Sequence, residues 1–355
     1  MKILVTGNLG YIGPVLGREI KQYFDNTYLS GIDTGIFASC INSSFSRLGD
    51  TYYDNLYWID VRDLNKEIIK NYEYVICLAA VSNDPIGKDF SEATISINFE
   101  STIKLASLCA ENGVKKFIFA SSCSIYGSAS NFPRKENDEL NPLTIYSKSK
   151  VKVEEKLTNL FKESQMEIYC LRFATACGSS DRLRLDLVLN DFVASGLKYG
   201  TISILSDGSP LRPLIDVKDM AKAIIWALLF KDFRSNIDST KNILSINVGS
   251  NEWNFKIIDL AKKVQEQLPY TKIGINKNSF PDKRSYKVNF DLYKNISSEF
   301  YPQRKIENTI EDLVKQLKSI DLPENNFRKT NYIRLNHLKN LIDQKIINNE
   351  LRWLE

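Results

Sequence analysis

The chain has little of several residues and patterns on which common protein functions depend. Among its 355 residues only His337 is a histidine, which nearly excludes histidine-based catalysis and histidine-rich metal sites. Its six cysteines form no Cys-x-x-Cys pair, which favours reduced thiols in a cytoplasmic protein over a zinc site or a disulfide framework. No apolar run has membrane-spanning length, and the N-terminus reads as a core strand rather than a signal peptide. The net charge of +4 is small and dispersed, so we expect no nucleic-acid partner and no membrane partner.

What the chain does have is a glycine-rich segment close to its N-terminus. Residues 3–5 predict a buried strand, which leads into Gly7, Gly10 and Gly13, spaced three apart, and then into a helical pattern. In such a fingerprint the first glycine permits a tight turn and the second lets the backbone approach a pyrophosphate. The third lets the helix pack closely, and the free N–H groups at the helix start face the phosphates. The pattern predicts a dinucleotide site, although a purely structural turn shares it.

An acidic residue follows where this fingerprint requires one. Residues 27–32 predict a second strand, and Asp33 ends it. A carboxylate there accepts hydrogen bonds from an adenosine ribose 2′-hydroxyl and repels a 2′-phosphate. No arginine or lysine lies between Gln22 and Arg47 to attract that phosphate. The position therefore favours NAD over NADP, whereas an isolated aspartate would more often cap a loop.

Strand and helix patterns alternate through the first half of the chain. Apolar runs at 74–80, 116–120 and 167–172 predict strands, and 91–112 and 145–163 show helical periodicity. Repeated units of this kind predict an α/β fold with a doubly wound parallel Rossmann sheet and a smaller C-terminal substrate-binding lobe. We expect a nucleotide-binding domain at 1–178 plus about 215–250, a substrate lobe at 179–214 and 251–322, and a helical extension at 323–355.

The side chains that carry chemistry are Ser122, Tyr146 and Lys150. Tyr146 and Lys150 lie four apart on a predicted helix and so share one face. A nearby ammonium and a cationic nicotinamide favour the tyrosine phenolate and bring its pKa down from about 10 toward neutrality. Ser122 then holds a substrate hydroxyl while Tyr146 removes its proton and hydride moves to the nicotinamide. A second Tyr-x-x-x-Lys match at 301–305 contains Pro302, which opposes a helix, so we interpret it as a chance match.

Together these motifs resemble an extended short-chain dehydrogenase/reductase of the NAD-dependent epimerase/dehydratase family, which acts on nucleotide-activated sugars. The matching segments are 6–13, Asp33, 60–61, 78–80, Asn98, 121–127, 146–150 and 171–173. The resemblance implies NAD as cofactor and the following cofactor-binding residues: Gly7, Asn8, Leu9, Gly10, Tyr11, Ile12, Gly13, Asp33, Asp60, Val61, Leu78, Ala79, Ala80, Asn98, Tyr146, Lys150 and Phe173.

The resemblance also implies a nucleotide-diphosphate sugar as substrate and a homodimer formed through helices 91–112 and 145–163. Residues 181–186 are similar to a stretch in sugar-nucleotide 4-dehydrogenases and epimerases of surface-polysaccharide pathways. An arginine fork suits a pyrophosphate, whereas each arginine could equally be a surface residue. The expected substrate-binding residues are Ser82, Cys123, Ser124, Thr175, Arg184, Asn190, Arg212, Asp282 and Arg284.

Two departures from the family pattern bear on the reaction. Family 4,6-dehydratases carry Asp-Glu directly after the catalytic hydroxyl residue, but this chain has Cys123 and Ser124, which disfavours elimination. With no histidine to activate it, Cys123 is interpreted as small-residue packing beside the sugar. Thr175 stands where many relatives carry asparagine, at the usual sugar-diphosphate contact.

We therefore expect a 4-epimerase or a 4-dehydrogenase that oxidises the sugar at C4. The alternatives are a 4,6-dehydratase or a 4-keto reductase and, in a different class, a non-catalytic Rossmann sensor that holds NAD. A sensor need not keep Ser122, Tyr146 and Lys150 together, so their presence argues for an enzyme. Residues 323–355 are locally basic with apolar positions at helical spacing. We expect them to form a helix docked on the C-terminal lobe, with a partner contact or a clamp on substrate phosphates as the alternative.

Overall fold

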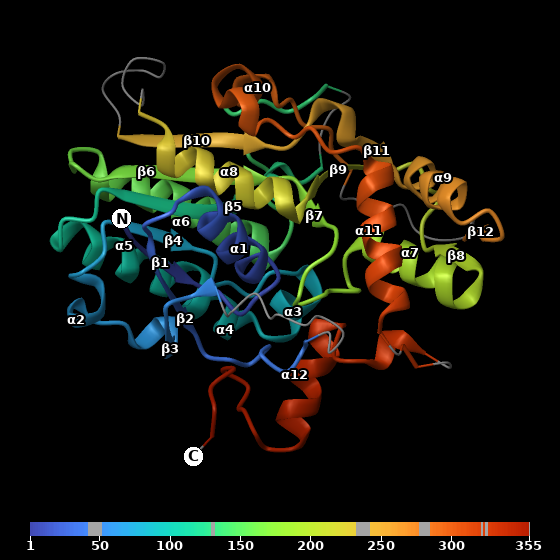
Figure 1. The fold of residues 1–355 in the computed structure, drawn as a ribbon, viewed down its shortest axis with the longest axis horizontal. Helices are drawn as coiled ribbons and strands as arrows, with labels where there is room; N and C mark the ends of the chain where they lie inside the picture. Colours follow the sequence, from blue (N-terminus) through green and yellow to red (C-terminus); the bar gives the residue numbers. More distant parts are fainter. Residues whose placement is uncertain are drawn as a thin grey trace.

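A parallel sheet forms the centre of the molecule (Figure 1). The computed structural model describes residues 1–41, 52–128, 132–231, 242–276, 285–320, 322–323 and 326–354. In spatial order the seven strands are β10 (Ile243–Val248), β6 (Glu167–Phe173), β5 (Lys116–Ser122), β4 (Tyr74–Cys77), β1 (Lys2–Thr6), β2 (Tyr28–Asp33) and β3 (Asn55–Trp58). All neighbouring pairs are parallel, which confirms the predicted doubly wound α/β fold. The strand order reverses between β1 and β4, where ligands bind in this fold class.

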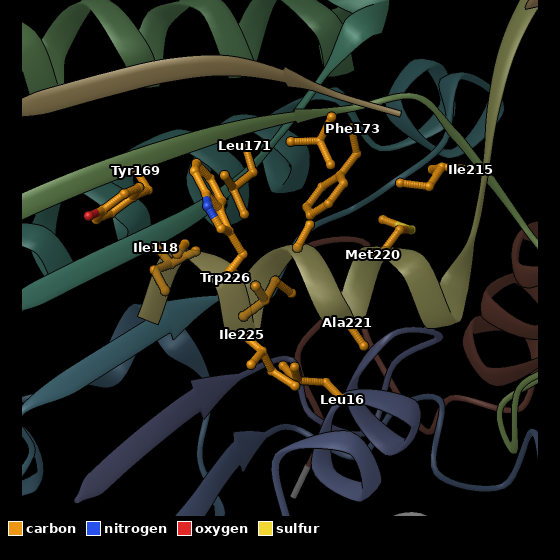
Figure 2. Close-up of a cluster of buried hydrophobic side chains, with 14 of the residues drawn as sticks. Leu16, Ile118, Tyr169, Leu171, Phe173, Ile215, Met220, Ala221, Ile225 and Trp226 are labelled. Carbon is orange, nitrogen blue, oxygen red and sulfur yellow. The ribbon is translucent and has the colours of Figure 1, made fainter. Parts of the chain in front are cut away.

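Helices cover both faces of this sheet because its strands are apolar on both sides. Helices α1 (Gly13–Tyr23) and α8 (Val217–Leu229) pack on one face, and α5 (Ser101–Glu111) and α6 (Ile145–Phe161) pack on the other. Figure 2 shows the first face, where Trp226 of α8 lies among side chains of β5 and β6, and Ile225 lies on the side of α8 that faces Leu16 of α1. The site is therefore built on a rigid, two-sided core.

The smaller lobe follows β6 and lies to the right of the sheet in Figure 1. Its own apolar core joins α7 (Val188–Tyr199), α9 (Ile257–Gln267) and α11 (Ile306–Lys318). Two small sheets belong to this region, with orders β11-β9-β7 and β12-β8. Their strands are β7 (Thr175–Cys177), β8 (Thr201–Ile204), β9 (Leu211–Asp216), β11 (Asn254–Lys256) and β12 (Lys272–Ile275).

Short helices connect these larger elements. They are η2 (Val61–Asp63), α2 (Lys66–Ile69), α3 (Asp84–Asp89), α4 (Ser91–Ile95), the π-helical turn η3 (Ser96–Glu100), η4 (Cys123–Tyr126), η5 (Asn251–Trp253), α10 (Asp291–Ser297), η6 (Ser298–Phe300), η7 (Phe327–Lys329) and α12 (Arg334–Asp343). In the described part of the chain, no helix is long and apolar enough to cross a membrane.

The structure differs from the sequence-based expectations at two places. Strand β4 ends at Cys77 instead of residue 80, because residues 78–80 turn away to line a cavity. The C-terminal extension packs against the nucleotide-binding side as well as against the lobe. Its Leu338, Ile347 and Leu351 share an apolar cluster with Ile36 and other residues of the N-terminal part. The expected helix forms as α12, but it docks on this N-terminal part, whereas the preceding Phe327 packs on the lobe.

Candidate active site

A large cavity, of about 1190 Å³, runs along the carboxyl ends of the central strands into the smaller lobe. Asp33 and Asp60 line one end, Ser122 and Tyr146 line the middle, and Arg212 lines the part formed by the lobe. Pockets for one small ligand usually have volumes of about 300–1,000 Å³. This cavity is therefore large enough for two ligands that meet beside Tyr146.

The loop after β1 packs closely because its glycines lie where a side chain would clash with neighbouring backbone. The lack of side chains at these positions leaves room for a ligand. Gly7 has a φ of +76°, and a Cβ there would lie 2.6 Å from the Ala79 nitrogen. A Cβ at Gly13 would lie 2.0 Å from the Asn8 oxygen, so α1 begins directly against the loop. Gly10, Tyr11 and Ile12 line the cavity, whereas Asn8, Leu9 and Gly13 lie beneath it. This cradle fits a dinucleotide pyrophosphate at the N-terminus of α1.

Asp33 keeps acceptor capacity for a ribose hydroxyl. Its two carboxylate oxygens accept hydrogen bonds from the N–H groups of Leu9 (3.1 Å) and Gly35 (2.9 Å) and retain further lone pairs. Burial raises the pKa of Asp33, and these two hydrogen bonds oppose that shift. Asp60 and Val61 line the same end of the cavity, and Asp60 forms a 2.5 Å ion pair with Arg62. The residues predicted to bind the adenosine half of NAD therefore lie together at one end of the cavity.

Asn98 does not reach the cavity, although the resemblance implied contact with the cofactor. It is buried in the π-helical turn η3, where its Oδ1 accepts from the Val81 N–H at 2.7 Å and its Nδ2 donates to the Val81 carbonyl at 2.9 Å. Because Leu78, Ala79 and Ala80 line the cavity just before Val81, Asn98 fixes the loop that carries them. Asn98 is thus a positioning residue.

The three predicted catalytic side chains meet in the middle of the cavity. Tyr146 and Lys150 project from the first turns of α6, whose capping box at Thr144 and Ser147 fixes the start of the helix. The Lys150 Nζ lies 5.5 Å from the Tyr146 ring centroid and donates to the Ala120 carbonyl at 2.7 Å. Ser122, at the end of β5, lies close enough to the Tyr146 side chain for its hydroxyl to lower the pKa of Tyr146. Parallel strand ends and the helix start explain why these residues converge.

The protein's own groups alone do not bring the pKa of Tyr146 toward neutrality, and the expectation also relied on the charge of a bound nicotinamide. Burial raises that pKa to about 12, and the Ser122 hydroxyl and the charge of Arg184 oppose the rise only partly. Burial also lowers the pKa of Lys150 to about 8. Removal of both groups from water favours their neutral forms, and this effect exceeds the influence of the neighbouring ammonium.

Several predicted substrate-binding residues line the far part of the cavity. They are Ser82, Ser124, Thr175, Arg184 and Arg212, and Phe173 of the predicted cofactor set lies with them. Arg184 pairs with Asp186 at 2.9 Å and donates from Nη1 to the Ser82 hydroxyl at 2.9 Å. These contacts hold a guanidinium between the dinucleotide side and the lobe.

Two predicted substrate contacts are absent from this cavity. Cys123 is fully buried behind β5, where its thiol donates to the Arg172 carbonyl at 3.0 Å. Asn190 is also fully buried, and its amide is hydrogen-bonded to Gly178 (2.9 Å) and to the Arg184 carbonyl (2.9 Å). Both predictions are wrong because the side chains face the interior of the protein. The predicted Asp282 and Arg284 lie outside the described residues.

Sequence reasoning missed several residues that line the cavity, among them Phe37, Tyr286 and Arg334. Phe37 follows β2 beside Asp33, and Arg334 comes from the C-terminal extension. Tyr286 lies beside Thr175 and under Arg212, whose guanidinium carbon is 5.9 Å from the Tyr286 ring centroid. The local basic charge of the extension was the only available signal for Arg334. Within the described ranges, no group of three or more His, Cys, Asp or Glu side chains is placed to hold a metal ion.

The 301–305 match takes no part in this site. Pro302 separates η6 from α11, which begins only at Ile306, and Tyr301 accepts a hydrogen bond from the Asn251 N–H at 3.1 Å. No Tyr301–Lys305 helix face exists to place these side chains together.

Comparisons with known proteins agree with this geometry. The model of the NAD dependent epimerase/dehydratase family matches residues 3–243. A UDP-glucose 4-epimerase from Mycoplasma genitalium is 26% identical over 285 residues, covering 74% of this chain and 81% of its own length.

Solved structures share the fold at lower sequence identity. A UDP-glucuronic acid 4-epimerase from Bacillus cereus, in complex with UDP-glucuronic acid and NAD, superposes with a TM-score of 0.73 at 22% identity, over 90% of this chain and 99% of that one. An NAD-dependent NDP-hexosamine 5,6-dehydratase of tunicamycin biosynthesis gives a TM-score of 0.75 at 21% identity over the same shares. The family match, together with the glycine cradle and Asp33, establishes that this chain belongs to the NAD-dependent epimerase/dehydratase family and uses NAD as its cofactor.

Proposed function

We propose that the protein is a nucleotide-sugar 4-epimerase, which oxidises the sugar of a nucleoside-diphosphate sugar at C4 and reduces it again on the opposite face. The observation that carries this proposal is the convergence of Ser122, Tyr146 and Lys150 at the midpoint of a cavity with room for two ligands. A sugar ring between the dinucleotide end and Arg212 would place its C4 hydroxyl beside the Tyr146 oxygen.

Tyr146, Ser122 and Lys150 carry out the acid–base chemistry of this reaction. Bound NAD would supply the acceptor for the C4 hydrogen as hydride and the donor for its return. Tyr146, as phenolate, takes the O4 proton while the C4–O4 bond becomes a carbonyl, and it gives that proton back when C4 is reduced. Ser122 donates a hydrogen bond to the same sugar oxygen and thereby orients it. Lys150 supplies positive charge 5.5 Å from the Tyr146 ring, which favours the phenolate.

The lobe would hold the diphosphate and the nucleoside. Arg212 lies over the Tyr286 ring at the wall of the cavity, where a guanidinium can pair with phosphate oxygens. Ser203 and Ser206, beside β8, line the same region and offer hydroxyl groups to the nucleoside. In domain terms, residues 1–178 with about 215–250 would bind NAD, and 179–214 with 251–322 would bind the substrate.

A 4,6-dehydratase is the second candidate, and the surroundings of Ser122 disfavour it. Ser124 accepts a hydrogen bond from Ser122 at 2.9 Å, and Cys123 points into the core, so neither supplies a carboxylate for elimination. Asp84 lines the cavity and interacts electrostatically with Tyr146, so it is an acid that could take this role.

We also propose a homodimer formed through α5 and α6. The adjoining α4 exposes 39% of Ile95, and α6 exposes 50% of Leu160, as expected for a face that a second copy covers. Sedimentation of the purified protein tests this assembly.

The six cysteines are buried free thiols, which fits the reducing environment of the cytoplasm.

A panel of nucleotide sugars tests the proposed reaction. Purified protein is incubated with UDP-, GDP-, dTDP- and CDP-sugars, and products are followed by mass spectrometry and NMR. The proposal predicts at least one C4 epimer with the mass of its substrate. A product lighter by one water would support the dehydratase and contradict the epimerase.

A further inference from the structure

The C-terminal segment, residues 326–354, forms a strap across the nucleotide-binding side of the molecule. It lies outside the family match, which ends at residue 243. Figure 1 shows it in red, running from the foot of α11 through α12 and past β2 and β3 to the C-terminus. The strap meets the loop after β2 through hydrogen bonds from His337 Nε2 to the Ile36 carbonyl (2.7 Å) and from Trp353 Nε1 to the Thr34 carbonyl (2.7 Å).

Further contacts fasten the end of the strap beside Asp60. The Arg62 guanidinium donates to the Glu350 carbonyl at 2.8 Å, and Arg352 forms an ion pair with Asp63 at 2.7 Å. Since Asp60 and Val61 line the adenosine end of the cavity, the strap is fixed to both loops that form this end.

The strap also provides part of the cavity wall. Ile333, Arg334, Leu338 and Leu351 line the cavity together with Ile36 and Phe37. Leu338 and Leu351 are almost fully buried in one apolar cluster with Ile36 and Val81. The adenosine end is therefore enclosed by side chains from opposite ends of the chain.

Arg334 is the polar group of this wall. Its side chain is only 3% exposed, and its guanidinium carbon lies 4.5 Å from the centroid of the Phe37 ring. Nη2 donates to the Arg182 carbonyl at 3.2 Å, but Nη1 has no hydrogen-bond partner among the described residues. No salt bridge within 4.0 Å joins it to a described carboxylate, although the Cys40 thiol and the more distant charge of Asp186 act on it. A buried guanidinium with an unused N–H group is costly unless a ligand pairs with it.

The position of Arg334 indicates which ligand group it meets. Asp33, the predicted ribose acceptor, lies close enough for the positive charge of Arg334 to oppose the burial-induced rise of its pKa. The first turn of α12 also favours an anionic ligand. Its N-cap residue, Ile333, provides no side-chain acceptor for the N–H groups of this turn and itself lines the cavity. A guanidinium and a helix N-terminus both favour an anionic oxygen.

We propose that the strap completes the adenosine end of the NAD site, and that Arg334 binds the adenosine monophosphate half of the cofactor. The strap then slows the dissociation of NAD, and bound NAD stabilises the strap. NAD therefore stays bound through many turnovers. This inference depends on NAD as the cofactor and not on the sugar or on the outcome of the reaction, so it can fail while the proposed epimerase activity stands.

Calorimetry with NAD, AMP and nicotinamide mononucleotide tests the role of Arg334. Arg334→Gln removes the charge, and we expect it to weaken NAD and AMP at least about tenfold while nicotinamide mononucleotide is unaffected. Arg334→Lys should restore part of the loss. Lys339→Gln is the matched control, because Lys339 lies on the same helix but pairs with Asp89 at 2.8 Å. The melting temperature of each variant without nucleotide separates a binding role from a structural one.

A second variant tests the strap without touching the cavity wall. Trp353→Phe removes the hydrogen bond to Thr34 from a side chain that is 48% exposed, so the fold should persist. We expect NAD to dissociate several times faster from this variant, measured by exchange against labelled NAD. Unchanged NAD affinity in Arg334→Gln would overturn the proposal. So would a loss confined to NADP, or a lower melting temperature with no change in AMP binding.

Discussion

The ammonium of Lys150 lies 5.5 Å from the centroid of the Tyr146 ring and is held there by the Ala120 carbonyl. Burial shifts the two groups in opposite directions, raising the pKa of Tyr146 to about 12 and lowering that of Lys150 to about 8. The resting protein thus keeps its base protonated. The cationic ring of bound NAD would add charge that favours the phenolate, and proton removal would then depend on the presence of the oxidant.

The first prediction concerns Tyr146. Tyr146→Phe keeps the ring but removes the proton-accepting oxygen, so turnover should fall by at least about 10²-fold while NAD and substrate still bind. Steady-state kinetics and calorimetry measure the two effects. Tyr301→Phe is the control, because Tyr301 belongs to the other Tyr-x-x-x-Lys match and does not line the cavity. Near-normal turnover of Tyr146→Phe would contradict the assigned role.

The second prediction concerns the choice of cofactor. Asp33 accepts two backbone hydrogen bonds at the adenosine end and would repel a 2′-phosphate, so NAD should bind far more tightly than NADP. Asp33→Ser should narrow this preference, chiefly by weakening NAD. Calorimetry with both nucleotides measures the ratio, and equal or tighter binding of NADP by the unmodified protein would refute the assignment.

The third prediction concerns stability and pH. The Asp219 side chain is 1% exposed, neither of its oxygens has a hydrogen-bond partner among the described residues, and Lys222 approaches only to 3.9 Å. Burial raises its pKa to about 7, against about 3.9 in an unfolded chain. The folded state therefore holds a proton that the unfolded state has lost between these values. The free energy of unfolding should fall as pH rises from about 4 to about 7, by up to about 4 kcal/mol, and then stay level.

Asp219→Asn removes this proton linkage and should stabilise the protein more at pH 8 than at pH 5. Thermal unfolding at the two pH values measures the difference. Asp259→Asn is the matched control, since Asp259 lies on α9 with 51% of its side chain exposed. Equal shifts in melting temperature for Asp219→Asn at both pH values would show that Asp219 is ionised in the folded protein at both. That result would contradict the prediction.

The sheet and the catalytic residues could be predicted because their signals are local. Apolar runs mark β1, β5 and β6, and the carboxyl ends of parallel strands meet at one edge wherever they occur in the chain. Ser122 and Tyr146 follow from a strand end and a helix start, so sequence position alone places them near each other.

The residues that were misplaced depend on side-chain direction or on distant packing. Cys123 directly follows Ser122, yet its thiol faces the core, because successive side chains at a strand end point in different directions. Asn190 bonds to backbone across the start of the lobe, which no local pattern reveals. Arg334 lies against Phe37 only because the strap folds back to this part of the molecule. No pattern near β2 in the sequence therefore predicts a positively charged residue there.

The most direct test of the central claim uses a nucleotide sugar that carries deuterium at C4, chosen from the panel as a substrate. The account predicts the C4 epimer, with unchanged mass and with the deuterium still on C4, because the hydrogen leaves and returns within one closed site. NMR of the product locates the label. Deuterium on C6 of a sugar lighter by one water would identify a dehydratase, and deuterium in released NADH would identify net oxidation. Either result would contradict the account.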